Sequence, residues 1–303
     1  MFISAPTPPP NEARQWVAEQ FGAGARVRTV RRLTGGITSA MHSLSIETAT
    51  GHLRHVVLRR WVDDDRIEGA DRVMRESHIL EQLADSDLPT PNVLAIDPTG
   101  ARCGHPALLM TRLPGRIELA PRNPELWLEE LAAMLARIHR ADVAAPVAES
   151  WLNRDKLIVP EWTKRRAIWR DAIELVNEAP PKGEHTFIHH DYQQFNTLWK
   201  RGRLCGVVDW VFGSYGTPSI DVGHCRLNLA VLFSSDYARR FLELYESASE
   251  RKVVPWWDVH ELLVYLPGWG DSLQLQAGRR LNVDFAGMHG RVEETLADAL
   301  RRV

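Results

Sequence analysis

The stretch FIHHDYQQFNTLWKRGRLCGVVDW, residues 187–210, decides how this chain is interpreted. It sets His189, Asp191 and Asn196 in one loop between two short apolar segments. A second acid, Asp209, follows the apolar run Gly-Val-Val. The residue types and their order raise the hypothesis that these side chains converge on one site.

The chemistry of Asp191, Asn196 and Asp209 indicates what such a site could do. Mg²⁺ prefers hard oxygen ligands and is usually held by one or two side chains together with phosphate oxygens. The Asn196 amide and the Asp209 carboxylate are such donors, and Asp191 could orient a substrate hydroxyl and accept its proton. Each feature alone is common in loops without a catalytic role. Their joint spacing between strand-like segments favours the functional interpretation.

The composition is that of an ordinary globular protein, with 44% hydrophobic and 25% charged residues in 303. A net charge of −2 gives no general attraction to nucleic acid or anionic membrane. Cys103, Cys205 and Cys225 form no Cys-x-x-Cys motif, so we expect reduced thiols in a cytoplasmic protein. The N-terminal segment lacks the pattern of a signal peptide, and no apolar run is long enough to span a bilayer.

The pattern along the chain changes about one third of the way in. Alternating apolar and polar residues predict strands at 26–33, 40–47, 54–61, 93–96 and 106–111, and helical spacing predicts helices at 11–21 and 69–84. Beyond a hinge near 111–116, Asn123 is a predicted N-cap and Pro124 begins a helix that runs to about Ala141. A further helix is predicted at 160–176, and the chain is mainly helical beyond Asp221.

Two features of the sheet-rich part are candidates for phosphate contacts. Gly35 and Gly36 form a turn between two strands, where glycine lets the backbone approach phosphate oxygens, and Thr38 and Ser39 add hydroxyl donors. A simple hairpin turn explains the same glycines.

The second feature is a pair of opposite charges. Glu76 shares one helix face with Leu80 and Leu83, so it should point into the protein and need a partner such as Arg59. The alternative is a solvated Arg59, with Glu76 paired to an arginine of its own helix.

The order of these features resembles the aminoglycoside phosphotransferase family of the protein-kinase-like superfamily, and also small-molecule kinases of the choline and homoserine kinase type. HHDYQQFNTLWKRGRLCGVVDWVFGSYGTPSIDVGHCR, residues 189–226, is similar to the family pattern HGDxxxxN…GxIDW…GxPxxDLA. The resemblance implies an α+β, bilobal, protein-kinase-like fold. Residues 1–112 would form a small antiparallel-sheet N-lobe with one helix that binds nucleotide, and 113–303 a larger, mainly helical C-lobe with the catalytic loop and substrate site.

The resemblance also implies roles, residue by residue. Asp191 would be the catalytic base, Asn196 and Asp209 would hold Mg²⁺, and His189 and Asp221 would support the catalytic loop. The nucleotide, ATP or GTP, would contact Gly35, Gly36, Thr38, Ser39, Arg59, Glu76 and a hinge of Met110, Thr111, Arg112 and Leu113. His139 matches a histidine of the first C-lobe helix and is expected to pack rather than to catalyse.

The chain departs from the family pattern at several positions. His190 replaces the usual Gly between His and Asp, and Gln193-Gln194-Phe195 replaces the frequent His-Pro-Gly. Thr217 replaces Asp, and Arg59 replaces Lys while keeping the positive charge. None of these changes removes the base or a metal ligand, so they bear on the substrate rather than on the type of reaction.

We therefore expect a Mg-dependent kinase that transfers the γ-phosphoryl group to a small-molecule hydroxyl. The alternative is a catalytically silent nucleotide-binding module. An antibiotic, choline, homoserine, a sugar or a macrolide all stay open as acceptors, and the oligomeric state stays open too. Trp256, Trp257, Tyr265 and Trp269 could form a stacking wall for a ring-bearing alcohol, although core packing is the more common role of such residues.

Overall fold

The computed structural model describes residues 8–33, 39–62, 66–265 and 284–303. The chain has an α+β fold of two compact units. The first consists of Met1–Gly115 together with Gly206–Val211, and the second of Arg116–Cys205 together with Phe212–Val303.

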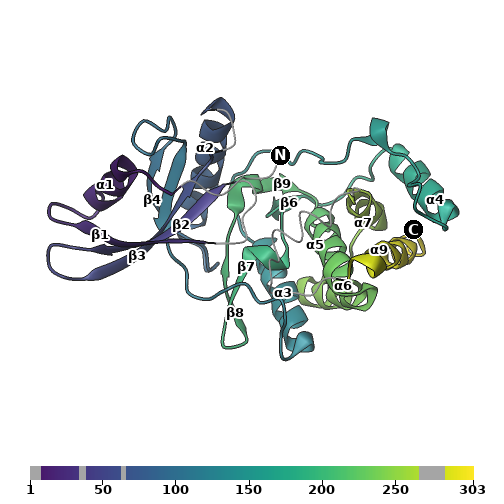
Figure 1. The fold of residues 1–303 in the computed structure, drawn as a ribbon. Helices are drawn as coiled ribbons and strands as arrows, with labels where there is room; N and C mark the ends of the chain where they lie inside the picture. The colour runs from purple at the N-terminus through teal and green to yellow at the C-terminus, as the bar shows by residue number, and fades with distance from the viewer. Residues whose placement is uncertain (1–7, 34–38, 63–65, 266–283) are drawn as a thin grey trace. The chain divides into compact units, whose positions relative to one another are not determined.

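The first unit is built on a five-stranded antiparallel sheet in the order β1-β2-β3-β5-β4, with two helices (Figure 1). All five predicted strands and both predicted helices are confirmed. The elements are α1 (Asn11–Glu19), β1 (Arg26–Arg32), β2 (Ala40–Glu47), β3 (Leu53–Arg60), α2 (Arg66–Leu83), β4 (Val93–Asp97) and β5 (Ala107–Thr111).

The sheet buries different side chains on its two faces because successive strand residues point in opposite directions. Leu44, Val56 and Leu58 pack with Trp16 of α1 in one apolar cluster. Leu58 pairs with Leu109 and Arg59 with Leu108, so Arg59 belongs to the opposite face. On α2, the predicted inward face of Glu76, Leu80 and Leu83 is confirmed, since all three side chains are buried.

The second unit is mainly helical and contains two small antiparallel pairs of strands, β6 with β9 and β7 with β8. Its described elements are α3 (Pro124–Ile138), α4 (Arg166–Asn177), β6 (Thr186–Ile188), β7 (Thr197–Lys200), β8 (Arg203–Val207), β9 (Ser214–Gly216), α5 (Pro218–Leu232), α6 (Ser235–Ser249), α7 (Pro255–Leu262) and α9 (Phe285–Leu300). The last two residues of β8 group with the first unit.

Helix α5 is the centre of the second unit. Every one of its residues is buried, which is typical of a helix covered on all sides. It contacts α6, α7 and α9, and its apolar residues share a cluster with α4, α7 and α9.

Local signals explain where two helices begin. The Asn123 side chain accepts a hydrogen bond from the Leu126 backbone and Pro124 is the first residue of α3, as predicted. The helix ends at Ile138, three residues before the predicted end. The predicted start of the next helix at residue 160 is wrong, because 160–165 form a turn in which the Thr163 hydroxyl accepts a bond from the Arg165 backbone. Helix α4 starts only at Arg166.

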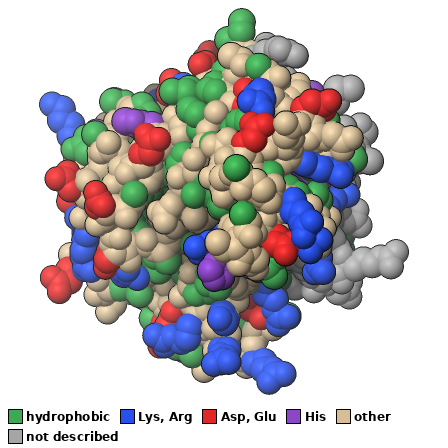
Figure 2. Space-filling view, turned by 90° about the vertical axis from the view of Figure 1, so that its left-hand side faces the viewer, with side chains coloured by type: hydrophobic (Ala, Val, Ile, Leu, Met, Phe, Trp, Pro, Cys, Tyr) green, Lys and Arg blue, Asp and Glu red, His purple; other side chains and the backbone are tan. Residues whose placement is uncertain are grey.

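The surface mixes charges of both signs. Figure 2 shows Lys and Arg side chains interspersed with Asp and Glu over the face in view, with several of the basic side chains gathered along its lower edge. The described helices include none with the length and apolar character needed to cross a membrane.

Candidate active site

The predicted catalytic loop joins β6 to β7 and brings Asp191 and Asn196 together. The chain turns at His190, whose φ is 69°, and forms a short 3₁₀ turn over Gln194–Asn196. The Asn196 amide nitrogen donates to the Asp191 backbone oxygen and to Oδ2 of its carboxylate, both at 2.9 Å. The five-residue spacing thus places the acid and the amide in direct contact.

The Asp191 carboxylate also receives two bonds on its other oxygen, Oδ1. His224 Nε2 lies 3.0 Å from it and Gln193 Nε2 lies 2.6 Å from it. Burial raises the pKa of Asp191, but the hydrogen bond and charge of His224 outweigh burial and lower that pKa overall. The Asp191 side chain is 18% exposed, so it is a reachable, ionised carboxylate.

Asp221, near the start of α5, braces this loop. Its Oδ1 accepts a bond from the His190 backbone at 2.6 Å, and its Oδ2 accepts one from the His189 backbone at 2.8 Å. The same Oδ2 lies 2.9 Å from His139 Nε2, and His139 Nδ1 lies 2.7 Å from the Tyr245 hydroxyl. These bonds outweigh the effect of burial and lower the pKa of Asp221. His139 is therefore a buried support of the loop.

His189 contributes from within the loop. Its ring Nδ1 accepts a bond from the Asp191 backbone at 3.3 Å. His189 is fully buried, so its ring fixes the backbone on which Asp191 stands.

An aromatic group covers the loop next to Asp191. The Trp151 indole stacks on His190 with centroids 4.6 Å apart and planes 4° apart, and its edge contacts His224 and Phe212. His190 Nδ1 lies 3.2 Å from the Ser214 hydroxyl. Trp151 is 37% exposed, so it offers an aromatic surface to a ligand of this unit.

The first unit holds a second charged group, formed by Arg59, Glu76 and Asp209. Arg59 Nη1 donates to both oxygens of Glu76 at 3.0 Å and to Asp209 Oδ1 at 2.6 Å. Arg59 Nε donates to the Ser39 hydroxyl at 3.0 Å, and the guanidinium carbon lies 4.7 Å from the centre of the Trp61 ring. The predicted pair of Arg59 with Glu76 is present, so the alternative of a solvated Arg59 is wrong.

Burial and neighbouring charges shift the pKa values of Arg59 and Glu76. Burial lowers the pKa of Arg59, but the charges of Asp209 and Glu76 outweigh it and raise that pKa. Burial raises the pKa of Glu76 to about 7, Arg59 opposes this rise and Asp209 adds to it. The ionised state of Glu76 thus depends on Arg59 remaining beside it.

Asn196 and Asp209 each keep one oxygen that carries none of the bonds described above. Asn196 uses its amide nitrogen toward Asp191, which leaves Oδ1, and Asp209 uses Oδ1 toward Arg59, which leaves Oδ2. Oxygen donors of this kind suit Mg²⁺. Across the described ranges no cluster of three or more His, Cys, Asp or Glu could hold a metal ion.

The structure describes only some of the remaining residues that were predicted to contact the nucleotide. Gly35, Gly36 and Thr38 lie outside the described residues, whereas Ser39 is buried and bonds to Arg59. The hinge begins at the end of β5 with Met110 and Thr111. Arg112 then donates its backbone N–H to the His55 carbonyl at 3.3 Å, and Leu113 follows two residues before the boundary of the unit.

Of the four aromatic residues considered for a stacking wall, the three that the structure describes belong to the core of the second unit or pack against it. Trp256 and Tyr265 are buried in the core of the second unit, with Trp257 packed against it. Trp269 lies outside the described residues. For Trp256 and Tyr265, the core-packing interpretation is confirmed.

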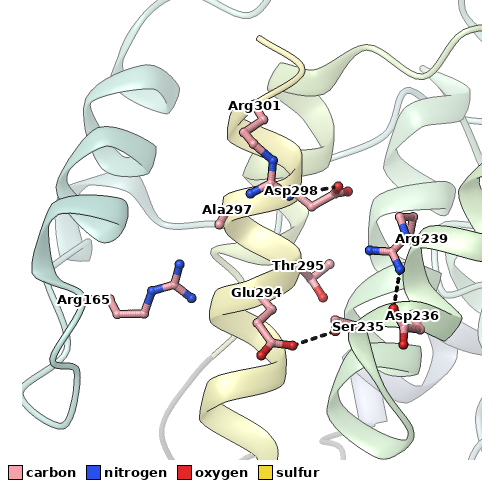
Figure 3. A pocket seen from close by; sticks show the side chains of 9 residues that line it. All are labelled: Arg165, Ser235, Asp236, Arg239, Glu294, Thr295, Ala297, Asp298 and Arg301. Atoms are coloured by element: carbon pink, nitrogen blue, oxygen red, sulfur yellow. Dashed lines mark hydrogen bonds and ion pairs between the residues drawn. The ribbon is translucent and has the colours of Figure 1, made fainter.

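A polar hollow elsewhere in the second unit contains none of the predicted site residues. It has a volume of about 340 Å³ and is lined by side chains of α6 and α9 and by Arg165 (Figure 3). Arg239 pairs with Asp236, and the Ser235 hydroxyl donates to Glu294 at 2.7 Å. Its charges largely satisfy one another, so we assign it no part in the chemistry.

Sequence reasoning missed three residues that contact or cover the catalytic loop: His224, Gln193 and Trp151. A signal existed for His224, because it lies three residues after Asp221 on the same helix face. Gln193 was noted only as a departure from the family pattern. Trp151 is 40 positions before Asp191 in a segment without regular structure, and no local pattern connects the two.

Comparison with known proteins gives relatives of two kinds. Acyl-CoA dehydrogenase family member 10 of Mus musculus is 27% identical over 192 residues, which are 56% of this chain and 18% of that protein. The chain therefore spans less than a fifth of the length of this curated relative.

Solved structures share the fold at low identity. A candidate aminoglycoside phosphotransferase from Ralstonia eutropha has a TM-score of 0.64 at 15% identity, covering 97% of this chain and 99% of that one. A thermostable mutant of aminoglycoside phosphotransferase APH(4)-Ia, in complex with ADP and hygromycin B, has a TM-score of 0.59 at 18% identity, covering 94% and 97%. The macrolide 2′-phosphotransferase MphH from Brachybacterium faecium has a TM-score of 0.52 at 17% identity, covering 96% and 99%.

These structures confirm the predicted kinase-like fold of an antiparallel sheet followed by a helical part. Comparison of the sequence with family models tests the family resemblance that residues 189–226 indicate. One model, described as the phosphotransferase enzyme family, matches the chain. That model matches residues 17–260, which is most of the chain. The chain therefore belongs to the phosphotransferase enzyme family.

Proposed function

We propose that this protein transfers the γ-phosphoryl group of ATP or GTP to a hydroxyl group of a small molecule. The observation that carries the proposal is the Asp191 carboxylate, which is ionised, partly exposed and fixed by Asn196 at 2.9 Å. Such a carboxylate can orient an acceptor hydroxyl and take its proton. Phosphoryl transfer asks little more of a protein than positioning and charge neutralisation.

Each of the other groups then has a task. Arg59 binds phosphate oxygens through its guanidinium, and Glu76 holds Arg59 in place. The glycines and hydroxyls at 35–39 are assigned to phosphate binding, and the hinge at 110–113 to binding of the base. His189 and Asp221 keep the loop rigid, which preserves the geometry of Asp191.

Magnesium fits the remaining donors. The free oxygens of Asn196 and Asp209 would hold it, and the ion would neutralise charge on the phosphates. In this proposal Asp209 keeps its Oδ1 bond to Arg59 and would offer Oδ2 to the ion, while Asn196 keeps its bond to Asp191 and would offer Oδ1.

The acceptor class stays broad. Hygromycin B is bound in the APH(4)-Ia complex and a macrolide is named for MphH, so antibiotics are reasonable acceptors to test here. Choline, homoserine and sugars are tested beside them. Cys103 and Cys225 are free thiols, which supports a cytoplasmic site of action.

A silent nucleotide-binding module is the second candidate function. Loss of Asp191, Asn196 or Asp209 would favour it, but all three are present. The first candidate therefore has the stronger support.

The test is turnover by an Asp191→Asn variant. The purified protein is offered ATP or GTP with Mg²⁺ and a panel of hydroxyl metabolites and antibiotics, and phosphorylated product is measured. The asparagine keeps the shape of the side chain but loses its charge, so we expect kcat to fall about a hundredfold or more. Nucleotide affinity, measured by calorimetry, should stay close to that of the wild type.

The exposed Asp142→Asn is the matched control and should turn over normally. An Asp191→Asn protein that turns over at the wild-type rate would refute the proposed role. A wild type that binds nucleotide but phosphorylates nothing in a broad panel would favour the silent module.

A further inference from the structure

The hydrogen bonds on Asp191 are divided unequally between its two oxygens. Oδ1 receives both His224 Nε2 at 3.0 Å and Gln193 Nε2 at 2.6 Å. Within the described parts of the chain, Oδ2 receives Asn196 Nδ2 alone, at 2.9 Å. An ionised carboxylate has about four lone-pair sites, two on each oxygen. Oδ1 is therefore saturated, and Oδ2 has one site left.

We propose that His224 is a positioning residue for phosphoryl transfer, which with Gln193 occupies Oδ1 of Asp191 and so assigns the acceptor hydroxyl to Oδ2. This inference rests on the proposed function and adds to it the side chain that selects the reacting oxygen. It also fixes the direction from which the acceptor approaches, because the carboxylate cannot rotate without breaking three hydrogen bonds.

The step assigned to Oδ2 balances as follows. The acceptor hydroxyl donates its hydrogen bond to Oδ2. As its oxygen bonds to the γ-phosphorus, the bond from that phosphorus to the β,γ-bridging oxygen breaks, and the nucleoside diphosphate leaves with that electron pair. The hydroxyl proton passes to Oδ2 of Asp191. His224 takes no part in the bonds that form and break.

His224 is well held for this task. It is 3% exposed, and its ring packs against that of Trp151 with planes 81° apart and centroids 5.2 Å apart. Its other nitrogen, Nδ1, faces Glu261 Oε2 at 4.0 Å. Glu261 is itself buried, and its Oε1 lies 2.9 Å from His260 Nδ1. An acidic side chain that cannot move away thus stands behind the imidazole.

The close approach of α7 to α5 that brings Glu261 there depends on Gly223. A Cβ added at Gly223 would lie 2.8 Å from the Cβ of Glu261. Contacts this short are not tolerated without a shift, so a larger residue would push α7 away from α5. The pair Gly223-His224 therefore places both the positioning imidazole and the support behind it.

The experiment compares two substitutions at this site. His224→Leu fills the space but donates no hydrogen bond, and we expect kcat to fall at least about tenfold, with the KM for nucleotide within about twofold of the wild type. His224→Gln keeps a donor nitrogen that can reach Oδ1, so it should recover most of the lost kcat. Gln193→Leu, which removes the other Oδ1 donor from the loop, should lower kcat in the same way.

A matched control separates positioning from packing. Leu227→Ala removes a buried side chain of the same helix, one with no hydrogen bond to Asp191, and should lower the melting temperature with little loss of kcat. Should Leu227→Ala lower kcat as much as His224→Leu at an equal loss of stability, or His224→Gln do no better than His224→Leu, the positioning role is wrong.

Failure of the proposed function has a different signature. In that case the wild type itself forms no phosphorylated product. If the wild type turns over and Asp191→Asn does not, the proposed function stands. Normal kcat in both His224→Leu and Gln193→Leu would then overturn the inference alone.

Discussion

At the scale of single residues, His190 shows how this chain handles a backbone position that suits glycine. Its φ of 69° lies in the left-handed region, where a side chain costs about 1 kcal/mol or more. The family pattern has Gly there. Here the side chain recovers stability through the Ser214 hydroxyl at 3.2 Å and the stacked Trp151.

We predict that His190→Gly lowers the free energy of unfolding by about 1–2 kcal/mol. The relief of strain is largely offset by the greater freedom of glycine in the unfolded chain, about 0.4–1 kcal/mol. The lost hydrogen bond and the lost ring contact are each worth about 1 kcal/mol. Urea denaturation monitored by circular dichroism measures the change.

Arg201→Gly is the control, since Arg201 has a φ of 54° but an exposed side chain. It should leave stability within about 0.5 kcal/mol of the wild type. If His190→Gly is as stable as the wild type, then strain, and not the Ser214 and Trp151 contacts, dominates at this position.

Residues whose role follows from local order could be predicted from sequence. Asp191 and Asn196 lie five positions apart in one loop, and Glu76 sits on an inward helix face, so both contacts were foreseeable. The bond from His224 to Asp191 joins positions 33 apart, and Trp151 reaches the loop from an irregular segment. Such contacts depend on tertiary packing between distant segments, which no periodic pattern in the sequence reveals.

At the scale of elements, strand β3 and helix α2 are joined by the buried pair of Arg59 and Glu76. Their side chains are 3% and 2% exposed, so neither charge is stabilised by water. Removing one partner from such a pair leaves a buried charge unpaired, which typically costs about 3–5 kcal/mol. The pair therefore fixes β3 against α2.

We predict that the double variant Arg59→Met with Glu76→Met is less destabilised than the sum of the two single variants, by about 1–3 kcal/mol. Each single change should also raise the KM for nucleotide, and Arg59→Lys should keep partial activity because it keeps the charge. Chemical denaturation and steady-state kinetics on the four proteins of the cycle measure both effects.

The control cycle uses Arg239 and Asp236, an exposed ion pair within helix α6. Its coupling should be about 0.3–0.5 kcal/mol, as for other exposed pairs one helical turn apart. If the effects of the Arg59 and Glu76 changes are additive, the pair contributes neither to stability nor to nucleotide binding as a unit, and the prediction is wrong.

Elements were predictable where one periodicity dominated. The five strands of the first unit were foreseen from alternating apolar and polar residues, although in the structure β5 is buried at four of its five positions. The start of α4 was not, because residues 160–165 include the apolar Trp162 but form a turn closed by Thr163. A side-chain cap of this kind competes with helix formation, and a window of apolar residues does not detect it.

At the scale of the whole molecule, the two proposed metal ligands belong to different compact units. Asn196 lies in the second unit and Asp209 in the segment Gly206–Val211 of the first. In our proposal each of them donates an oxygen to magnesium. A thermal scan of the whole protein reports on each ligand separately.

We predict that Mg²⁺ with a non-hydrolysable nucleotide raises the melting temperature of the wild type, and that Asp209→Ala loses the magnesium-dependent part of that rise. A ligand at a hundred times its Kd stabilises the folded state by about 2.7 kcal/mol, which a thermal scan resolves easily. Chelation by EDTA should reduce the wild type to the smaller rise given by nucleotide alone. Asp209→Ala should show only this smaller rise, with or without EDTA.

Two further variants decide what that result means. Asn196→Ala should behave like Asp209→Ala, because it removes the other proposed metal oxygen. Asp191→Asn should keep the full magnesium-dependent rise, because Asp191 serves the acceptor hydroxyl and not the metal. A full rise in Asp209→Ala would refute the metal assignment, whereas loss of the rise in Asp191→Asn would make that carboxylate a ligand and not the base. The thermal scan thus separates the two roles without relying on turnover or on the identity of the acceptor.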